Sequence, residues 1–176
     1  GIEFGEAALE RLAIQLGSDV PACVRLRPLV MRGTGERLID VAAPDMPAVL
    51  VNPGITLETR RVFDRFDQLG ANRTFRETDP PWAGDLESYA ASLANYRNDL
   101  QPAAVALCPE IERALTIIRA EPGCLFARMS GSGPTCFGIF ADDASAEAAA
   151  RRISEKKRKY WVRPTLFRGM PDLPND

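Results

Sequence analysis

The chain has 176 residues, of which 45% are hydrophobic and 26% are charged, and its net charge at pH 7 is −2. This balance is typical of one medium or two small globular domains, and it lacks the basic excess expected of a nucleic-acid-binding protein. The absence of histidine excludes Ser-His-Asp and Cys-His nucleophilic sites and most catalytic zinc sites. Any general base must therefore be another residue type, and a carboxylate is the first expectation.

The four cysteines are Cys23, Cys108, Cys124 and Cys136, and none belongs to a CxxC pair. We therefore expect no metal site, and reduced core cysteines as in a cytoplasmic protein. No apolar run reaches the about 18 residues that a membrane-spanning helix needs, so we expect no membrane partner.

In chain order, helical spacing of leucines predicts an amphipathic helix between Gly5 and Gly17. Residues 20–26, "VPACVRL", are predicted to form a short strand entered through a proline. Residues 29–41 then have the pattern of a β-hairpin that turns at 33–35. A buried strand is expected over 48–54, where a Pro-Gly turn ends it.

The next predicted helix covers residues 56–69, with Thr56 as its N-cap, and a polar surface loop follows over 72–84. The remaining predicted elements are helices and strands that alternate to the end of the chain. They are a helix from Leu86 to Leu100, a helical segment over 98–107, a helix begun by Pro109, strands over 124–129 and 135–140, a helix around 146–153, and a strand over 161–167.

This order favours an α+β fold in which helices cover one face of a sheet. The basic run "EKKRKY", residues 155–160, is interpreted as a solvated helix end in preference to a nucleic-acid patch, since the rest of the chain shows no basic stripe.

Three motifs carry candidate chemistry. In "LGSDVPACV", Asp19 follows a helix-ending glycine. The pattern fits equally an aspartate that caps the next turn and a carboxylate that accepts a proton from a hydroxyl attacking a phosphate.

The second motif is "RMSGSGPTCFGIF", residues 128–140. Its glycines either close a hairpin or let backbone N–H groups converge on an anion, with hydroxyl donors from Ser130, Ser132 and Thr135. The pattern alone favours the hairpin, and no Rossmann or GxxxxGK[ST] fingerprint is present.

The third motif is "VNPGITLETRRVF", which carries Phe63 on the helix after a Pro-Gly turn. Core packing is the favoured interpretation of an isolated phenylalanine there. An exposed ring could instead stack on a nucleobase.

Together, and in this order, the three motifs resemble the later motifs of the GHMP kinase superfamily, and "GTGERL" and "NDLQP" (residues 98–102) fit the same pattern. The closest resemblance is to the branch that uses ATP and Mg²⁺ to phosphorylate an erythritol hydroxyl of a cytidine-diphosphate substrate. That branch serves the non-mevalonate route to isoprenoid precursors.

The resemblance implies roles for particular residues. Asp19 matches the catalytic aspartate that acts as general base, Phe63 the aromatic that stacks on cytosine, and Thr59 a substrate contact. Ser130, Gly131, Ser132 and Gly133, with Thr135 after them, match the glycine-rich loop beside the phosphates. No metal ligand is carried over.

The resemblance also implies two domains. Residues 1–45 would be the end of a ribosomal-S5-like N-terminal domain, with "GIEF" (1–4) compatible with a cloning remnant. Residues 46–168 would be the C-terminal domain with its ferredoxin-like sheet, and 169–176 a loose tail. The family's glycine-rich ATP loop is missing from these residues, so we expect the isolated chain to be inactive as a kinase and to self-associate through uncovered apolar surface.

Two alternatives stay open. One is another kinase of the superfamily, of the homoserine or mevalonate type. The other is a non-catalytic α+β ligand-binding or regulatory module, in which Asp19 is a plain turn residue.

Overall fold

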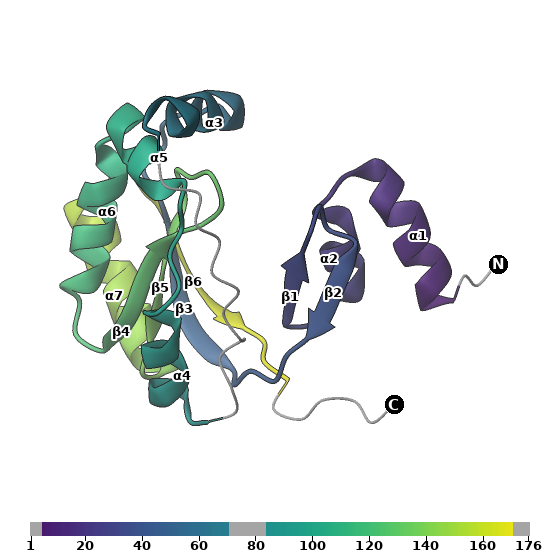
Figure 1. Ribbon diagram of the computed structural model, residues 1–176. Coiled ribbons are helices and arrows are strands. Elements are labelled where there is room, and N and C mark those ends of the chain that lie inside the picture. Colours follow the sequence, from purple (N-terminus) through teal and green to yellow (C-terminus); the bar gives the residue numbers. More distant parts are fainter. Residues whose placement is uncertain (1–4, 71–83, 171–176) are drawn as a thin grey trace. The chain divides into compact units, whose positions relative to one another are not determined.

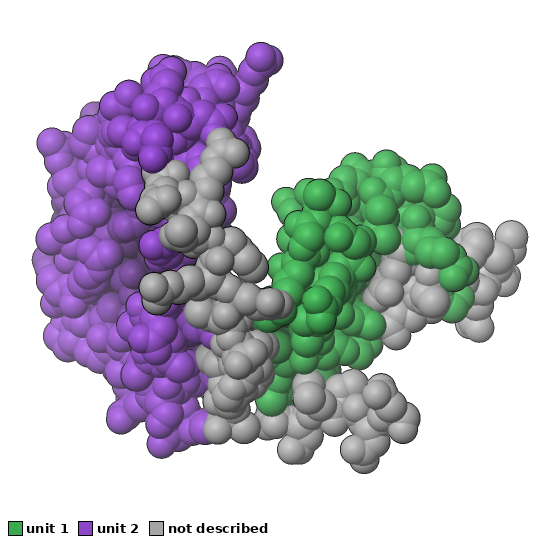
Figure 2. All heavy atoms as spheres, in the orientation of Figure 1, with its two compact units in different colours: residues 1–45, 80–83, 168–176 green, residues 46–79, 84–167 purple. Residues whose placement is uncertain are grey.

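The computed structural model describes residues 5–70 and 84–170, and these form two compact units (Figure 2). The N-terminal unit contains residues 5–45 and 168–170 of the described chain. The sheet unit contains residues 46–70 and 84–167.

The sheet unit is built on four antiparallel strands in the spatial order β4-β5-β3-β6 (Figure 1). Two helices, α6 and α7, cover one face of this sheet. The succession β3-α6-β4-β5-α7-β6 with this strand order confirms the predicted α+β, ferredoxin-like sheet. The elements are β3 Met46–Asn52, α6 Glu110–Arg119, β4 Cys124–Met129, β5 Cys136–Phe140, α7 Asp143–Lys156 and β6 Trp161–Phe167.

The core lies between these two helices and the sheet. Ile111, Leu115 and Ile118 recur at helical spacing along α6, and none of the three is exposed to solvent. On α7 the buried face is mostly alanine and ends at Ile153, and small side chains let a helix approach a sheet closely. Both faces were predicted from the sequence, as was each strand of the sheet to within two residues.

Three more helices flank the sheet: α3 Thr59–Gln68, α4 Leu86–Leu93 and α5 Gln101–Leu107. Helices α3 and α5 pack together at one end, and α4 packs against β4 at the other (Figure 1). The predicted N-cap Thr56 is wrong, because α3 begins only at Thr59 and Glu58 holds the cap position. The loop predicted over 72–84 lies almost wholly outside the described residues.

The prediction that one helix runs from Leu86 to Leu100 is also wrong, because α4 ends at Leu93. The guanidinium of Arg128 on β4 donates to the carbonyl oxygens of Leu93 and Tyr96. The Leu93 carbonyl also accepts a bond from the Tyr96 N–H over 3.1 Å, so a local turn and a long-range guanidinium both bind the end of the helix. Local spacing could not reveal the long-range partner.

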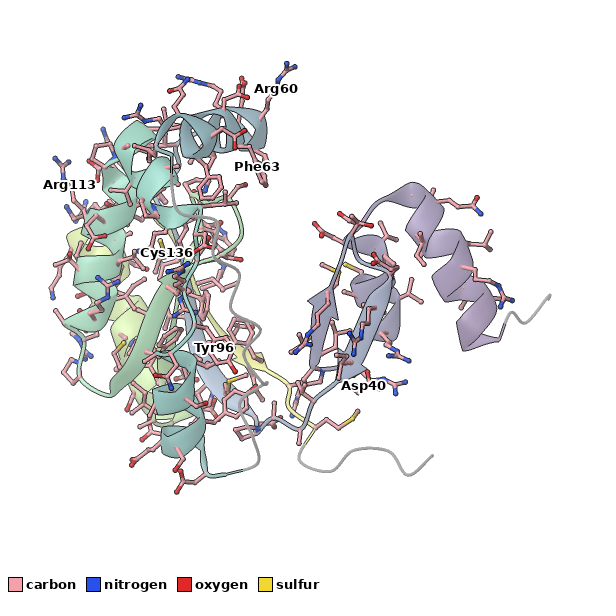
Figure 3. The ribbon with its side chains drawn as sticks, in the orientation of Figure 1. Asp40, Arg60, Phe63, Tyr96, Arg113 and Cys136 are labelled. Carbon is pink, nitrogen blue, oxygen red and sulfur yellow. The ribbon has the colours of Figure 1, made fainter. Side chains whose placement is uncertain are left out.

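The N-terminal unit contains two helices, α1 Glu6–Leu16 and α2 Val20–Arg25, and the predicted hairpin, β1 Leu29–Arg32 with β2 Arg37–Asp40. The strand predicted for residues 20–26 is wrong. Pro21 stands in the first turn of α2, where its fixed φ and missing N–H favour a helix. Arg25 at the end of α2 forms an ion pair with Asp40 of the hairpin, 3.1 Å away, and Figure 3 labels Asp40.

The four cysteines all lie in the described residues and form no disulfide, as predicted. Cys108 and Cys136 are buried and Cys124 is half-buried, but Cys23 is exposed, so its assignment to the core was wrong. Within residues 5–70 and 84–170, no helix has the length and apolar character needed to cross a bilayer.

Candidate functional site

The glycine-rich loop, residues 130–135, connects β4 to β5. The N–H of Ser130 donates to the carbonyl of Thr135 over 2.9 Å, and the N–H of Gly133 donates to the carbonyl of Ser130, also over 2.9 Å. Gly131 and Gly133 have φ values of +53° and +81°, which favour glycine. The loop is therefore a hairpin connection, as the bare pattern predicted.

The same backbone also leaves donors available. Among the described residues, no protein acceptor takes a hydrogen bond from the N–H groups of Gly131 and Ser132. A Cβ at Gly131 would meet nothing within 4 Å, whereas one at Gly133 would lie 2.7 Å from the sulfur of Met129. The loop therefore packs inward at Gly133 and is open at Gly131, where successive N–H groups can receive an anion.

Two asparagines hold this loop in place. The Asn98 amide donates to the carbonyls of Met129 and Gly131 over 3.0 and 2.7 Å. The Asn52 amide donates to the Thr135 hydroxyl over 2.8 Å. Neither asparagine was predicted to act on the loop, although the "NDLQP" and "VNPG" motifs that contain them were singled out.

Helix α3 carries Thr59 and Phe63, the two residues predicted to contact the substrate, and it begins beside the same loop. The hydroxyl oxygen of Thr59, its first residue, lies 2.9 Å from that of Ser132. One turn later Phe63 is 50% exposed, and its ring projects from α3 rather than into the core (Figure 3). The core-packing interpretation of Phe63 is therefore wrong, and the ring is accessible for stacking.

Asp19 belongs to the N-terminal unit, in the turn between α1 and α2 rather than between a helix and a strand. It occupies the N-cap position of α2, but its side chain makes no capping hydrogen bond. Its carboxylate is exposed, and the Ser18 hydroxyl lies 3.4 Å from it. The capping role that the sequence left open is therefore not realised.

The hairpin turn of "GTGERL" supports the Asp19 turn. A Cβ on Gly35, whose φ is +101°, would lie 2.1 Å from the carbonyl oxygen of Ser18. The turn is itself fixed by Glu36, whose carboxylate accepts bonds from the N–H and hydroxyl of Thr34. These bonds, with the bond to the Glu36 backbone as the largest cause, hold the pKa of the Glu36 carboxyl below its ordinary value.

The described residues contain no group of three or more His, Cys, Asp or Glu side chains that could hold a metal ion. In nucleotide sites Mg²⁺ is coordinated by phosphate oxygens of the substrate, by water and by one or two carboxylates, so a loop with open N–H donors fits the phosphates of a nucleotide that brings its own Mg²⁺.

Comparison with known proteins identifies the family. Residues 73–159 match the family model "GHMP kinases C terminal". Over 164 residues the chain is 45% identical to a protein of Cereibacter sphaeroides named 4-diphosphocytidyl-2-C-methyl-D-erythritol kinase, covering 89% of this chain and 56% of that protein. The chain therefore spans about half the length of the curated relatives it matches.

Solved structures show the same relationship. A crystal structure of 4-(cytidine 5′-diphospho)-2C-methyl-D-erythritol kinase superposes with a TM-score of 0.66 and 32% identity, covering 92% of this chain and 57% of that one. A homoserine kinase from Cytophaga hutchinsonii superposes with a TM-score of 0.64 at 13% identity, over 88% of this chain and 53% of its own. At that identity the likeness concerns the fold alone.

Proposed function

The chain belongs to the GHMP kinase family, and from that premise we propose that a protein containing it is an ATP-dependent kinase. The substrate we propose is 4-diphosphocytidyl-2-C-methyl-D-erythritol, which would be phosphorylated on a hydroxyl group of its erythritol moiety in the non-mevalonate pathway. The observation that carries this proposal is the 45% identity to a relative of that name over 89% of the chain.

The carboxylate of Asp19 is the proposed general base. It would accept the proton of the attacking hydroxyl, whose oxygen bonds to the γ-phosphorus of ATP while the bond from that phosphorus to the β–γ bridging oxygen breaks and ADP leaves. An exposed carboxylate without a capping bond is compatible with this role, because no backbone N–H competes for its lone pairs.

The glycine-rich loop is the proposed phosphate-side element. The N–H groups of Gly131 and Ser132 would donate to phosphate oxygens, with the hydroxyls of Ser130, Ser132 and Thr135 nearby. ATP would bring Mg²⁺ with it, and this ion would offset the negative charge of the phosphates. Asn52 and Asn98 would keep the loop in its receiving geometry.

Helix α3 is the proposed substrate-side element. Its exposed Phe63 would stack on the cytosine ring, and Thr59 would contact the substrate beside the loop. Homoserine kinase shares the fold at only 13% identity, so the fold alone does not separate the two substrates. The sequence identity favours the cytidine substrate, and the family match argues against a non-catalytic module.

We assign residues 1–45 to the end of the N-terminal domain, 46–168 to the C-terminal domain, and 169–176 to a tail, of which residues 169 and 170 group with the N-terminal unit in the structure. The division of the structure into compact units at residues 45 and 46 supports the first boundary. The family's ATP loop is missing from the 176 residues, so the chain alone should show negligible turnover. Measurable ATP-dependent phosphorylation by the isolated chain would contradict that expectation.

Helix α1 supports the proposed self-association of the isolated chain. Its leucines form the apolar face of the predicted amphipathic helix, and Leu9, Leu12 and Leu16 are 39%, 49% and 79% exposed. Such a stripe favours a covering partner. We expect sedimentation to show dimers or larger species, and Leu12→Glu/Leu16→Glu to abolish them while Leu69→Glu does not. A strict monomer at high concentration would exclude this association.

The substrate assignment is tested with the full-length protein. Cytidine diphosphate should raise its thermal unfolding temperature, and Phe63→Ala should remove most of that rise while leaving protection by ATP unchanged. Protection by homoserine or mevalonate without any effect of the cytidine nucleotide would overturn the substrate and leave the kinase class intact.

A further inference from the structure

The basic run at residues 156–159 lies at the exposed end of a helix, as its sequence predicts, but it also forms a defined turn. Helix α7 ends at Lys156, and the N–H of Lys157 still donates to Ile153 over 2.8 Å. The chain then turns sharply, because the Tyr160 N–H donates to the Lys157 carbonyl over 2.8 Å. Arg158 and Lys159 consequently form the centre of a hydrogen-bonded turn rather than a frayed end.

This turn forms one wall of a cavity of about 530 Å³ in the sheet unit. The turn between β3 and α3, residues 53–55, forms the opposite wall, and Glu110 at the start of α6 completes the lining. The two walls meet tightly, since a Cβ on Gly54 would lie 3.2 Å from the Lys159 carbonyl. The size falls in the range of small-molecule sites.

Tyr160 and Glu110 fix the floor of this cavity. The Tyr160 hydroxyl donates to the Glu110 carboxylate over 2.8 Å, and Arg113, which points away from the sheet in Figure 3, binds the same carboxylate. The bond from Tyr160 is the largest cause that holds the pKa of Glu110 below its ordinary value. Glu110, the one carboxylate among the lining residues, is thus already bound by protein donors.

The basic side chains of the lining have fewer protein partners. Lys157 lies over the Tyr160 ring at 5.8 Å, and Lys156 shares Glu121 with Arg152. Within the described chain, neither Arg158 nor Lys159 has a carboxylate at ion-pair distance. Lysine and arginine stay charged at neutral pH, so the cavity carries a positive excess.

A second cavity of the sheet unit, of about 610 Å³, differs in this respect. Its Arg97 pairs with Asp99 at 2.6 Å and its Arg119 with Glu112 at 3.1 Å. Its Arg128 is committed to the carbonyls at the end of α4. Arginines that are satisfied by protein acceptors attract an added anion less than free ones do.

We propose that the cavity between residues 53–55 and 156–160 binds a small multiply charged phosphate anion, of the diphosphate or triphosphate class. The site goes beyond the proposed kinase function, because none of its lining residues belongs to the glycine-rich loop or to the Asp19 turn. A nucleic-acid strand needs a basic track, whereas here the cations line a single pocket on a chain of net charge −2.

The test is calorimetric titration of the chain with pyrophosphate at fixed ionic strength, without nucleotide. We expect a sub-millimolar dissociation constant that Arg158→Ala/Lys159→Ala weakens about tenfold or more. The matched control is Arg37→Ala/Arg151→Ala, which removes the same charge from exposed positions outside the cavity and should leave the affinity unchanged. Thermal unfolding checks that each variant is folded.

Mapping of backbone chemical-shift changes on the unmodified chain is a second measurement of where pyrophosphate binds. Shifts confined to residues 53–55 and 156–160 would support the site. Absent binding, equal weakening in both double variants, or shifts centred on residues 130–133 would overturn it. Tighter binding of a single-stranded oligonucleotide through the same arginine and lysine would also overturn it. No kinase assay enters the test, so its outcome is independent of the proposed function.

Discussion

The hydroxyl oxygens of Thr59 and Ser132 lie 2.9 Å apart, although 73 residues separate them in the chain. One begins α3 and the other stands in the glycine-rich loop, so the contact joins the proposed substrate side to the proposed phosphate side. The contact therefore brings two motifs that are distant in the sequence together at one edge of the sheet unit.

The contact can be measured with a double-mutant cycle of Thr59→Val and Ser132→Ala. A hydrogen bond between hydroxyls contributes about 0.5–1.5 kcal/mol, and exposure of this pair places it at the low end. We expect urea unfolding of the two single variants and the double variant to give a coupling of about 0.5 kcal/mol. Additive effects would show that the two hydroxyls do not interact in solution.

Asn98 should matter more than its surface position suggests. Asn98→Ala removes the bonds to the carbonyls of Met129 and Gly131 and the bond that its side-chain oxygen accepts from the Leu100 N–H. We expect a loss of about 1–3 kcal/mol in unfolding free energy and faster hydrogen exchange in residues 130–135. Asn95→Ala, at the exposed end of α4, is the control and should change neither. Unchanged loop exchange in Asn98→Ala would remove this residue as a brace.

Gly35→Ala should disturb the Asp19 turn from a distance in sequence. The substitution adds strain at a positive φ and also places a methyl group against the Ser18 carbonyl. Gly70→Ala is the matched control, because φ is +60° there and a Cβ would meet nothing within 4 Å. We expect Gly70→Ala to cost about 1–2 kcal/mol and Gly35→Ala clearly more, with shifted Ser18 and Asp19 amide resonances. Equal costs would mean that the hairpin does not support the turn.

The sequence predicted the sheet unit well because its elements are locally encoded. The buried face of α6 follows from helical spacing, and the strands follow from short apolar runs, so β3 through β6 were placed to within two residues. Residues 20–26 were assigned wrongly because apolar, β-branched residues at so short a length fit either a strand or a helix. Pro21 in the first turn and the packing of these residues against α1 decide in favour of the helix. The packing cannot be read from the sequence pattern.

The site was only partly predictable for a similar reason. Glycine and serine spacing located the loop, and the resemblance located Asp19, Thr59 and Phe63. The exposure of Phe63 and the bonds from Asn52 and Asn98 depend on contacts between segments distant in the chain. Spacing cannot reveal such contacts, so the braces of the loop emerged only from the structure.

Thiol reactivity tests the burial of the cysteines. Burial raises the pKa of the Cys136 thiol to about 12, so its reactive thiolate is scarce at pH 8, and Cys108 is equally enclosed. We expect one thiol, the exposed Cys23, to react rapidly with a disulfide reagent, and the other three only slowly or after unfolding. Cys23→Ser should eliminate the rapid phase. A rapid phase of more than one equivalent would show that the core opens readily.

The most direct test of the central claim is turnover by the full-length protein with ATP, Mg²⁺ and 4-diphosphocytidyl-2-C-methyl-D-erythritol, before and after Asp19→Asn. We expect transfer of the γ-phosphoryl group to the substrate hydroxyl, and a fall in kcat of about 10²-fold or more in the variant with its unfolding temperature unchanged. Absent transfer in the unmodified protein, or an unchanged kcat in the variant, would contradict the kinase assignment or the role of Asp19 respectively.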